Sequence, residues 1–433
     1  MKSQRERWQV LTVALMVFGY AGYYLCRSNL SVTLPLIIDD LASRGVDPSV
    51  ARVRLGTIAS IGVLAYALTK FSGGRIADAI GGRRNFLWGM GGSIACTFLF
   101  ALAGGFPAFT FAWALNRSVQ ALGWGGMIKV TSRWFSYSSY GFVMGIISLS
   151  FLFGDALARQ FMSALIAREF SWQSIFWICG ATLSGLLLVN LLFLHESPEE
   201  IGEIEGEANP DSLVRSDGDG KVLGPLLTSP AFWIVCMLSL GMTIVRETFN
   251  LWTPTYFTEA FHFTQSEAAS DSALFPFFGG LSVLVAGALG DCLGKGGRAL
   301  VMLFGLFLTA GTLLLLANGT SPTGAVVLVA GAAFLLIGPY SYLAGAISLD
   351  FGGKQASGTA CGLIDGTGYL GGVLAGDSVA RISGTYGWRG SFVFLAAVCL
   401  VSGALATAYY VYQRRMLVMK FSLDSHKTVT GSP

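Results

Sequence analysis

The sequence contains few charged residues and almost no histidine. Asp, Glu, Lys and Arg make up 12% of its 433 positions and histidine occurs three times, whereas a soluble domain is about 25% charged. The seven cysteines lie apart without Cys-x-x-Cys spacing, so they predict small buried residues rather than disulfides or a zinc site. A net charge of +3 is too small and too dispersed for nucleic-acid binding. These deficits exclude a water-soluble globule and predict neither a metal nor a cofactor.

Long apolar runs dominate the chain. Apolar residues make up 53% of the sequence and the mean hydropathy is +0.61. A helix needs roughly 20 apolar residues to cross a bilayer, and the runs predict an all-α polytopic membrane protein with twelve transmembrane helices. The expected spans are 9–37, 55–77, 86–105, 107–130, 141–167, 173–194, 230–258, 268–289, 299–317, 323–349, 357–382 and 388–412.

One long polar segment divides the spans into two groups of six. It is acidic and rich in Pro and Gly, which is typical of a flexible linker. We expect an N-terminal six-helix bundle (1–194), a cytoplasmic linker (195–228), a C-terminal six-helix bundle (229–412) and a cytoplasmic tail (413–433). Lysine and arginine are concentrated in the short loops on the side of both termini, so both termini are predicted to be cytoplasmic.

Three landmarks recur in the second half of the chain. Gly74-x-x-x-Asp78 recurs as Gly287-x-x-x-Asp291 at an offset of 213, and Trp172-x-x-x-Phe176 recurs as Trp388-x-x-x-Phe392 at 216. Gly141-x-x-x-Gly145 recurs as Gly358-x-x-x-Gly362 at 217, and these glycines predict close helix packing between the halves. The offsets indicate two homologous bundles in the same topology, which places a substrate site at their interface near mid-membrane. This arrangement resembles the architecture of the major facilitator fold.

Two arginines lie near the centres of corresponding spans. Arg27 is in the first span and Arg246 in the seventh, 219 positions apart. A charge at the centre of a span costs roughly 2.5–3.5 kcal/mol and is a functional candidate by default. Glu247 is adjacent to Arg246, but on a regular helix it projects about 100° away. Two converging guanidinium groups predict a site for a phosphate dianion.

Other polar residues share helix faces with these arginines. The expected stripes are Tyr20, Tyr24, Arg27 and Ser31; Thr243, Arg246, Asn250 and Thr253; Asn116, Gln120 and Trp124; and Asp365 with Tyr369. Among them Tyr24, Gln120, Asn250, Trp124 and Tyr369 are candidate substrate-binding residues.

Several stretches resemble the organophosphate:phosphate antiporter family of the major facilitator superfamily. This family includes bacterial glycerol-3-phosphate and hexose-phosphate transporters and the microsomal glucose-6-phosphate translocase. The similar segments are 19–35, 66–78, 115–135, 244–257 and 358–372. The resemblance implies that Arg27 and Arg246 are paired phosphate-binding arginines, and that Lys70, Trp124 and Tyr369 match family lysine, tryptophan and tyrosine positions.

The segment GGRIADAIGGRR (73–84) resembles the superfamily's signature loop. We expect Asp78 to pair with the loop arginines Arg83 and Arg84 and to latch one conformation, with Asp291 at the repeated position. The chain departs from the family where Phe151 replaces a fifth-helix histidine. Asp155 and Arg159, four residues apart, predict an ion pair, with a role in substrate binding as the alternative. Arg117 has no assigned counterpart.

These patterns predict a secondary transporter that exchanges a phosphorylated organic anion, such as a sugar phosphate or a glycerol or three-carbon phosphate, for inorganic phosphate. We expect it to act as a monomer in a bacterial inner membrane. Two alternatives remain, a receptor that senses external sugar phosphate and a proton-coupled anion symporter using Glu247, Asp155 or Asp365. No nucleophile–base pair or phosphate-binding glycine loop predicts an enzyme.

Overall fold

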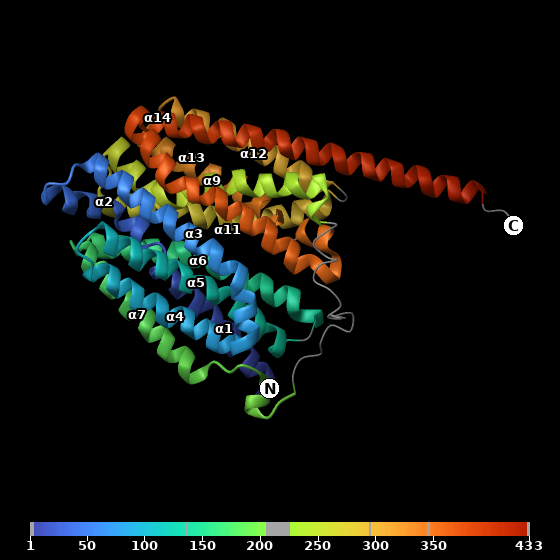
Figure 1. Cartoon of the computed structure of the whole chain (residues 1–433), viewed down its shortest axis with the longest axis horizontal. Coiled ribbons are helices and arrows are strands. Elements are labelled where there is room, and N and C mark those ends of the chain that lie inside the picture. The colour runs from blue at the N-terminus through green and yellow to red at the C-terminus, as the bar shows by residue number, and fades with distance from the viewer. Residues whose placement is uncertain (1–3, 136, 205–225, 294–295, 344–346, 431–433) are drawn as a thin grey trace.

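Two groups of long helices lie side by side in the computed structural model (Figure 1). The structure describes residues 4–135, 137–204, 226–293, 296–343 and 347–430. The N-terminal half contains α1 (Gln4–Leu25), α2 (Asn29–Ser43), α3 (Pro48–Ile80), α4 (Gly82–Leu102), α5 (Phe106–Trp134), α6 (Tyr137–Ile166) and α7 (Trp172–Phe193). The C-terminal half contains α9 (Pro230–Phe261), α10 (Gln265–Ser272), α11 (Leu274–Cys292), α12 (Gly297–Ala317), α13 (Pro322–Tyr342) and α14 (Ser348–Thr430).

The described residues contain ten segments that are long and apolar enough to cross a bilayer. One of them, 360–415, has 56 residues, which as a single helix would be about 84 Å long, far more than a bilayer needs. Gly387 departs from helical geometry with a φ of 66°, and the ribbon of α14 reverses direction between its orange and red parts (Figure 1). In the N-terminal half, α5 lies against α3 and α4. The long apolar helices agree with the predicted all-α membrane fold.

Serine and proline set the first turn of several helices. Ser229 and Ser321 precede Pro230 and Pro322, and each serine side chain accepts a hydrogen bond from a backbone N–H in the first turn. Proline fits this position because its missing N–H has no partner within the helix. A serine cap contributes about 1 kcal/mol. These local signals fix where the seventh and tenth expected spans begin.

The first expected span is broken where a continuous helix is predicted. Residues 26–28 form a turn between α1 and α2, and Arg27 lies inside this break. The Cys26 carbonyl accepts hydrogen bonds from the side-chain amides of Asn116 (3.2 Å) and Gln120 (3.1 Å). A helix can be interrupted inside a membrane only where the freed backbone groups find such partners. Two amides on α5 therefore maintain the break that carries Arg27.

The backbones of the two halves come close together where α3 crosses α14. A Cβ added at Gly56 would lie 2.8 Å from the Gly376 carbonyl oxygen, and one at Gly376 would lie 2.3 Å from that of Gly56. The predicted packing role of Gly362 is wrong in this conformation, since a Cβ there would meet nothing within 4 Å. The other three glycines of that repeat lie outside the residues whose side chains are described. Close backbone contact at Gly56 and Gly376 positions the second and eleventh spans against each other.

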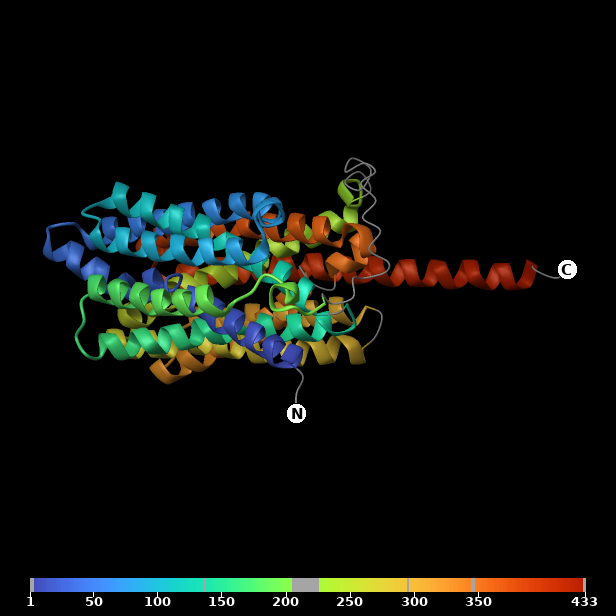
Figure 2. The same ribbon diagram turned by 90° about the horizontal axis from the view of Figure 1, so that it is seen from below.

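The first part of the expected linker packs on the N-terminal half. The 3₁₀ helix η1 (Pro198–Ile201) follows α7, and the His195 ring lies 4.9 Å from that of Trp8. Residues 205–225 lie outside the described part. The helix of the expected tail continues to Thr430, past the end of the bundle (Figure 2). Five cysteines are buried as predicted, but Cys292 is exposed and Cys361 is partly exposed.

Candidate functional site

A cavity of about 840 Å³ lies between the two halves, within the size range of small-molecule sites. Helices of both halves contribute to its lining, which is mostly aromatic and apolar with a set of charged groups. The charged residues that line it are Arg27, Lys70, Arg117, Arg159 and Arg246, with Asp155, Glu247 and Asp365. Five cations therefore face three carboxylates among the described lining residues, and the cavity has an excess of positive charge.

Arg246 is paired with its neighbour along the chain. Its Nε and Nη2 donate to Glu247 Oε1 at 3.1 and 2.7 Å. The expectation that Glu247 projects away from Arg246 is wrong, because both side chains are long enough to fold toward each other into the cavity. The guanidinium also lies over the Tyr340 ring, 4.6 Å from its centroid, and 5.4 Å from that of Tyr369. Arg246 thus faces the cavity with its charge balanced.

Lys70 joins the two halves inside the cavity. The ammonium group on α3 forms an ion pair with Asp365 on α14. Lys70 Nζ lies 5.0 Å from the Tyr369 ring centroid and 5.4 Å from that of Tyr66. Lys70 and Tyr369, both candidate substrate-binding residues, thus lie together in the cavity with Tyr66. Tyr66 precedes Lys70 by four residues on the same helix face, a spacing that would have identified it from the sequence.

Arg27 has aromatic rather than acidic neighbours. Its Cζ lies 4.7 Å from the centroid of the Tyr66 ring and 5.3 Å from that of Tyr24. Arg117, 4% exposed, lies over the same Tyr66 ring at 4.9 Å. Within the described part of the chain, neither arginine forms an ion pair with a carboxylate. Sequence analysis identifies Arg27 as a candidate binding residue but assigns no role to Arg117.

The other candidate substrate-binding residues fall into two groups. Trp124 lines the cavity and contacts Tyr20, with ring centroids 5.6 Å apart. Asn250 also lines it, and its carbonyl accepts a hydrogen bond from Ser31 of the opposite half at 2.7 Å. Gln120 is 1% exposed and lies behind the cavity wall, where its amide bonds the broken first span. Its position is that of a structural support, not of a ligand contact.

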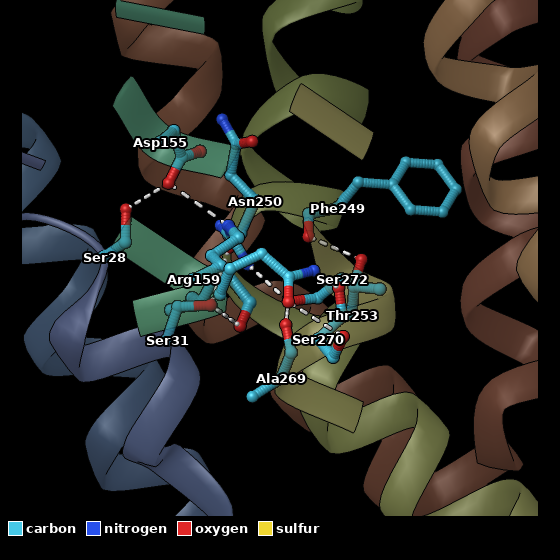
Figure 3. Close-up of polar contacts among 12 residues, drawn as sticks. Ser28, Ser31, Asp155, Arg159, Phe249, Asn250, Thr253, Ala269, Ser270 and Ser272 are labelled. Atoms are coloured by element: carbon cyan, nitrogen blue, oxygen red, sulfur yellow. Dashed lines mark hydrogen bonds and ion pairs between the residues drawn. The ribbon is translucent and has the colours of Figure 1, made fainter. Parts of the chain in front are cut away.

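Asp155 and Arg159 form the predicted ion pair, with Nε and Oδ1 3.1 Å apart. The pair also bridges the halves (Figure 3). Arg159 Nη1 donates to Ser272 Oγ at 3.0 Å and Nη2 to the Asn250 carbonyl at 2.8 Å, while Ser28 donates to Asp155. The Arg159 side chain is 2% exposed. We call Ser28, Asp155, Arg159, Asn250 and Ser272 the bridging network.

Further contacts between the halves surround the bridging network at one end of the bundle. This distal end carries the connections 44–47, 167–171 and 262–264. Arg52 pairs with Glu259 there, Gln160 donates to the Ser270 carbonyl at 2.9 Å and Gln265 donates to Asp39 at 2.7 Å. These contacts hold the two halves together at the distal end.

The predicted latch around Asp78 is described only in part. The side chains of Asp78 and Asp291 lie outside the described residues, and Arg84 is exposed. Glu196, in the acidic segment that follows α7, accepts hydrogen bonds from the backbone N–H groups of Gly82 and Arg83 at 2.8 and 2.6 Å. A carboxylate at a helix N-terminus is stabilised by the helix dipole. Glu196 therefore fixes the start of α4.

Comparisons with known proteins give one family. The sequence profile described as Major Facilitator Superfamily matches residues 16–376. The chain is 26% identical to "Probable hexose phosphate transport protein" of Chlamydia pneumoniae, over 93% of this chain and 91% of the relative. It is 24% identical to "Glycerol-3-phosphate transporter" of Bacillus subtilis, over 90% of each, and 26% identical to "Membrane sensor protein UhpC" of Escherichia coli, over 92% and 91%.

A solved structure has the same fold. The bacterial homologue of the human lysosomal transporter Spinster, in an inward-facing and unoccupied conformation, superimposes with a TM-score of 0.78 at 14% identity, over 96% of this chain and 98% of the other. The family match covers most of the sequence, and the fold agrees with it. The chain therefore belongs to the Major Facilitator Superfamily and is a polytopic α-helical membrane protein.

Proposed function

We propose that the protein exchanges a phosphorylated organic anion for inorganic phosphate by alternating access. The observation that carries the proposal is the excess of cations over carboxylates, five to three, among the described residues that line one cavity between the halves. Arginine binds phosphoryl oxygens through paired N–H donors. Relatives named as hexose-phosphate and glycerol-3-phosphate transporters give the substrate class.

The charge distribution provides a physical reason for exchange. Arg27 lies in the N-terminal half and Arg246 in the C-terminal half, and both face the cavity. A dianion on Arg27 presents negative charge to Arg246 and draws the halves together. Without an anion the N-terminal half presents positive charge, and the Arg246–Glu247 pair, which is already balanced, offers nothing that draws the halves together around the cavity. Reorientation without a ligand is then slow, which is the property of an exchanger.

The proposed orientation follows the distribution of lysine and arginine. Cationic loops lie on the side of the termini, so both termini are cytoplasmic and the distal end faces outward. The relatives of bacterial origin favour an inner membrane. We propose that a monomer suffices for transport, because one chain supplies the whole cavity.

The test is uptake of radiolabelled phosphate by proteoliposomes that contain phosphate, compared with vesicles that contain none. We expect uptake only into loaded vesicles and competition by unlabelled phosphate monoesters. Arg27→Gln should abolish uptake, whereas Arg54→Gln should not, because Arg54 lies over Phe106 outside the cavity. Equal uptake into loaded and unloaded vesicles would contradict exchange.

A receptor is the second candidate, favoured by the 26% identity to a membrane sensor protein. Saturable ester binding without flux, lost in Arg27→Gln, would support it. A proton-coupled symporter is less well supported. Glu247, Asp155 and Asp365 each pair with a cation, so protonating any of them would leave another unpaired positive charge in the cavity. Uptake driven by a pH gradient alone would favour that alternative.

A further inference from the structure

Arg117 on α5 is a buried cation that the proposed function counts in the charge of the cavity but to which it assigns no contact with the substrate. It lines the cavity between the halves and is 4% exposed. Among the described residues it forms no ion pair, and its guanidinium lies over the face of the Tyr66 ring, with Cζ 4.9 Å from the centroid. An aromatic face attracts a cation but does not neutralise it. A buried arginine with no acidic partner requires a reason.

Arg27 occupies the same environment. Its Cζ lies 4.7 Å from the centroid of the same Tyr66 ring, so the two guanidinium carbons are at most about 10 Å apart. Both residues belong to the N-terminal half, Arg27 in the break between α1 and α2 and Arg117 on α5. Two guanidinium groups at this separation repel each other, and an anion between them removes the repulsion.

The other charges of the cavity balance one another. Lys70 pairs with Asp365, Arg159 with Asp155 and Arg246 with Glu247. Among the described lining residues, the remaining charge is therefore +2, carried by Arg27 and Arg117. A phosphate monoester or inorganic phosphate ion with two negative charges neutralises this pair. A phosphodiester with one negative charge does not.

We propose that Arg117 contacts the substrate, and that Arg27 and Arg117 together hold the phosphoryl dianion in the conformation of this structure. The proposal rests on the proposed transport of organic phosphates and deepens it. Arg246 is paired with Glu247 in this structure. When the halves close around the cavity, the bound anion competes with the Glu247 carboxylate for the Arg246 guanidinium, and Arg246 then contacts the phosphate. The pair Arg27 and Arg117 selects dianionic phosphate monoesters over monoanionic diesters of the same tetrahedral shape.

The experiment measures phosphate exchange in proteoliposomes and its inhibition by methyl phosphate and by dimethyl phosphate. Methyl phosphate carries up to two negative charges, whereas dimethyl phosphate carries one. Both present the same tetrahedral phosphorus centre. In the wild type we expect methyl phosphate to inhibit at a concentration at least tenfold lower than dimethyl phosphate. In Arg117→Gln we expect the KM for phosphate to rise at least tenfold and the preference for methyl phosphate to shrink severalfold. A structural role alone would not change this preference.

Two further variants keep the result interpretable. Arg117→Lys retains the charge but replaces the planar fork by a single ammonium group, so we expect a preserved preference with a KM raised at least threefold. Arg54→Gln, an exposed arginine over Phe106 outside the cavity, serves as the matched control and should behave as the wild type.

The outcomes separate the two proposals. A wild type that neither exchanges phosphate nor binds either ester refutes the proposed function itself. A wild type that exchanges phosphate, with an unchanged KM and an unchanged preference in Arg117→Gln, refutes the role of Arg117 and leaves exchange intact. If Arg117→Gln does not fold, an unchanged KM in Arg117→Lys refutes it equally.

Discussion

Replacing Arg159 by lysine should weaken the closed distal end without removing the ion pair to Asp155. In the structure Arg159 donates to Ser272 Oγ at 3.0 Å and to the Asn250 carbonyl at 2.8 Å, both in the opposite half. Lysine has one ammonium group and cannot reproduce three donors directed at three acceptors. At least one bond between the halves is therefore lost, while the charge next to Asp155 is kept.

The size of the effect follows from the lost bond. A hydrogen bond from a charged group contributes about 1.5–3 kcal/mol, and Arg159 is 2% exposed, so water does not replace the missing partner. A change of about 2 kcal/mol corresponds to a roughly thirtyfold change in a conformational equilibrium. Since the lost bond exists only while the distal end is closed, the equilibrium should shift toward the conformation in which this end is open.

Spin labels on either side of the distal end report this shift. Arg44 in the N-terminal half and His262 in the C-terminal half lie in exposed connections at this end. Each is replaced by cysteine and labelled, in a variant from which Cys292 and Cys361 have been removed. We expect double electron–electron resonance to show a larger population of long distances in Arg159→Lys. Arg168→Lys, an exposed arginine after α6, is the matched control. Identical distance distributions for Arg159→Lys and wild type would refute the closing role of the bridging network.

Three more predictions follow from the cavity and its supports. Arg27→Lys keeps the charge but loses the planar fork, so phosphate exchange should fall at least tenfold with normal membrane insertion; near-normal uptake would contradict the role of Arg27. Lys70→Met leaves Asp365 unpaired in the cavity and should raise the KM for phosphate at least tenfold, and adding Asp365→Asn should recover part of the loss; a double variant no better than Lys70→Met would disprove their coupling. Gln120→Leu removes one amide from the Cys26 carbonyl and should cost about 1–3 kcal/mol of stability, seen as a lower unfolding temperature with an unchanged KM; a raised KM at unchanged unfolding temperature would place Gln120 in the site instead.

The helical membrane fold was predictable because apolar run length depends only on local sequence. The internal duplication also predicted that corresponding spans face one cavity, and Arg27 and Arg246 both line it. The break at Arg27 was not predictable from periodicity, because its partners Asn116 and Gln120 are about 90 residues away in the chain. Because the side chains that stabilise the break come from a distant segment, the apolar pattern of the first span itself predicts a continuous helix.

The pairing of charges was the least predictable part of the site. Arg246 and Lys70 both line the cavity, but which carboxylate each one meets depends on rotamers and on how the halves dock. Lys70 meets Asp365 where α3 packs against α14, and the backbones of these two helices come close at Gly56 and Gly376. Arg117 carried no repeat partner or family match, so only its burial without an acidic partner brought it to attention.

The interruption at residues 26–28 divides the first span into two arms, and the second arm packs on the N-terminal half while also contacting the C-terminal half. The Cys26 carbonyl at the end of the first arm is held by α5 of the N-terminal half, whereas Ser31 on the second arm donates to the carbonyls of Asn250 and Leu251 in the C-terminal half. Any relative motion of the halves therefore acts on the joint that carries Arg27. By thermodynamic reciprocity, an anion bound to Arg27 must bias that motion as strongly as the motion alters its affinity.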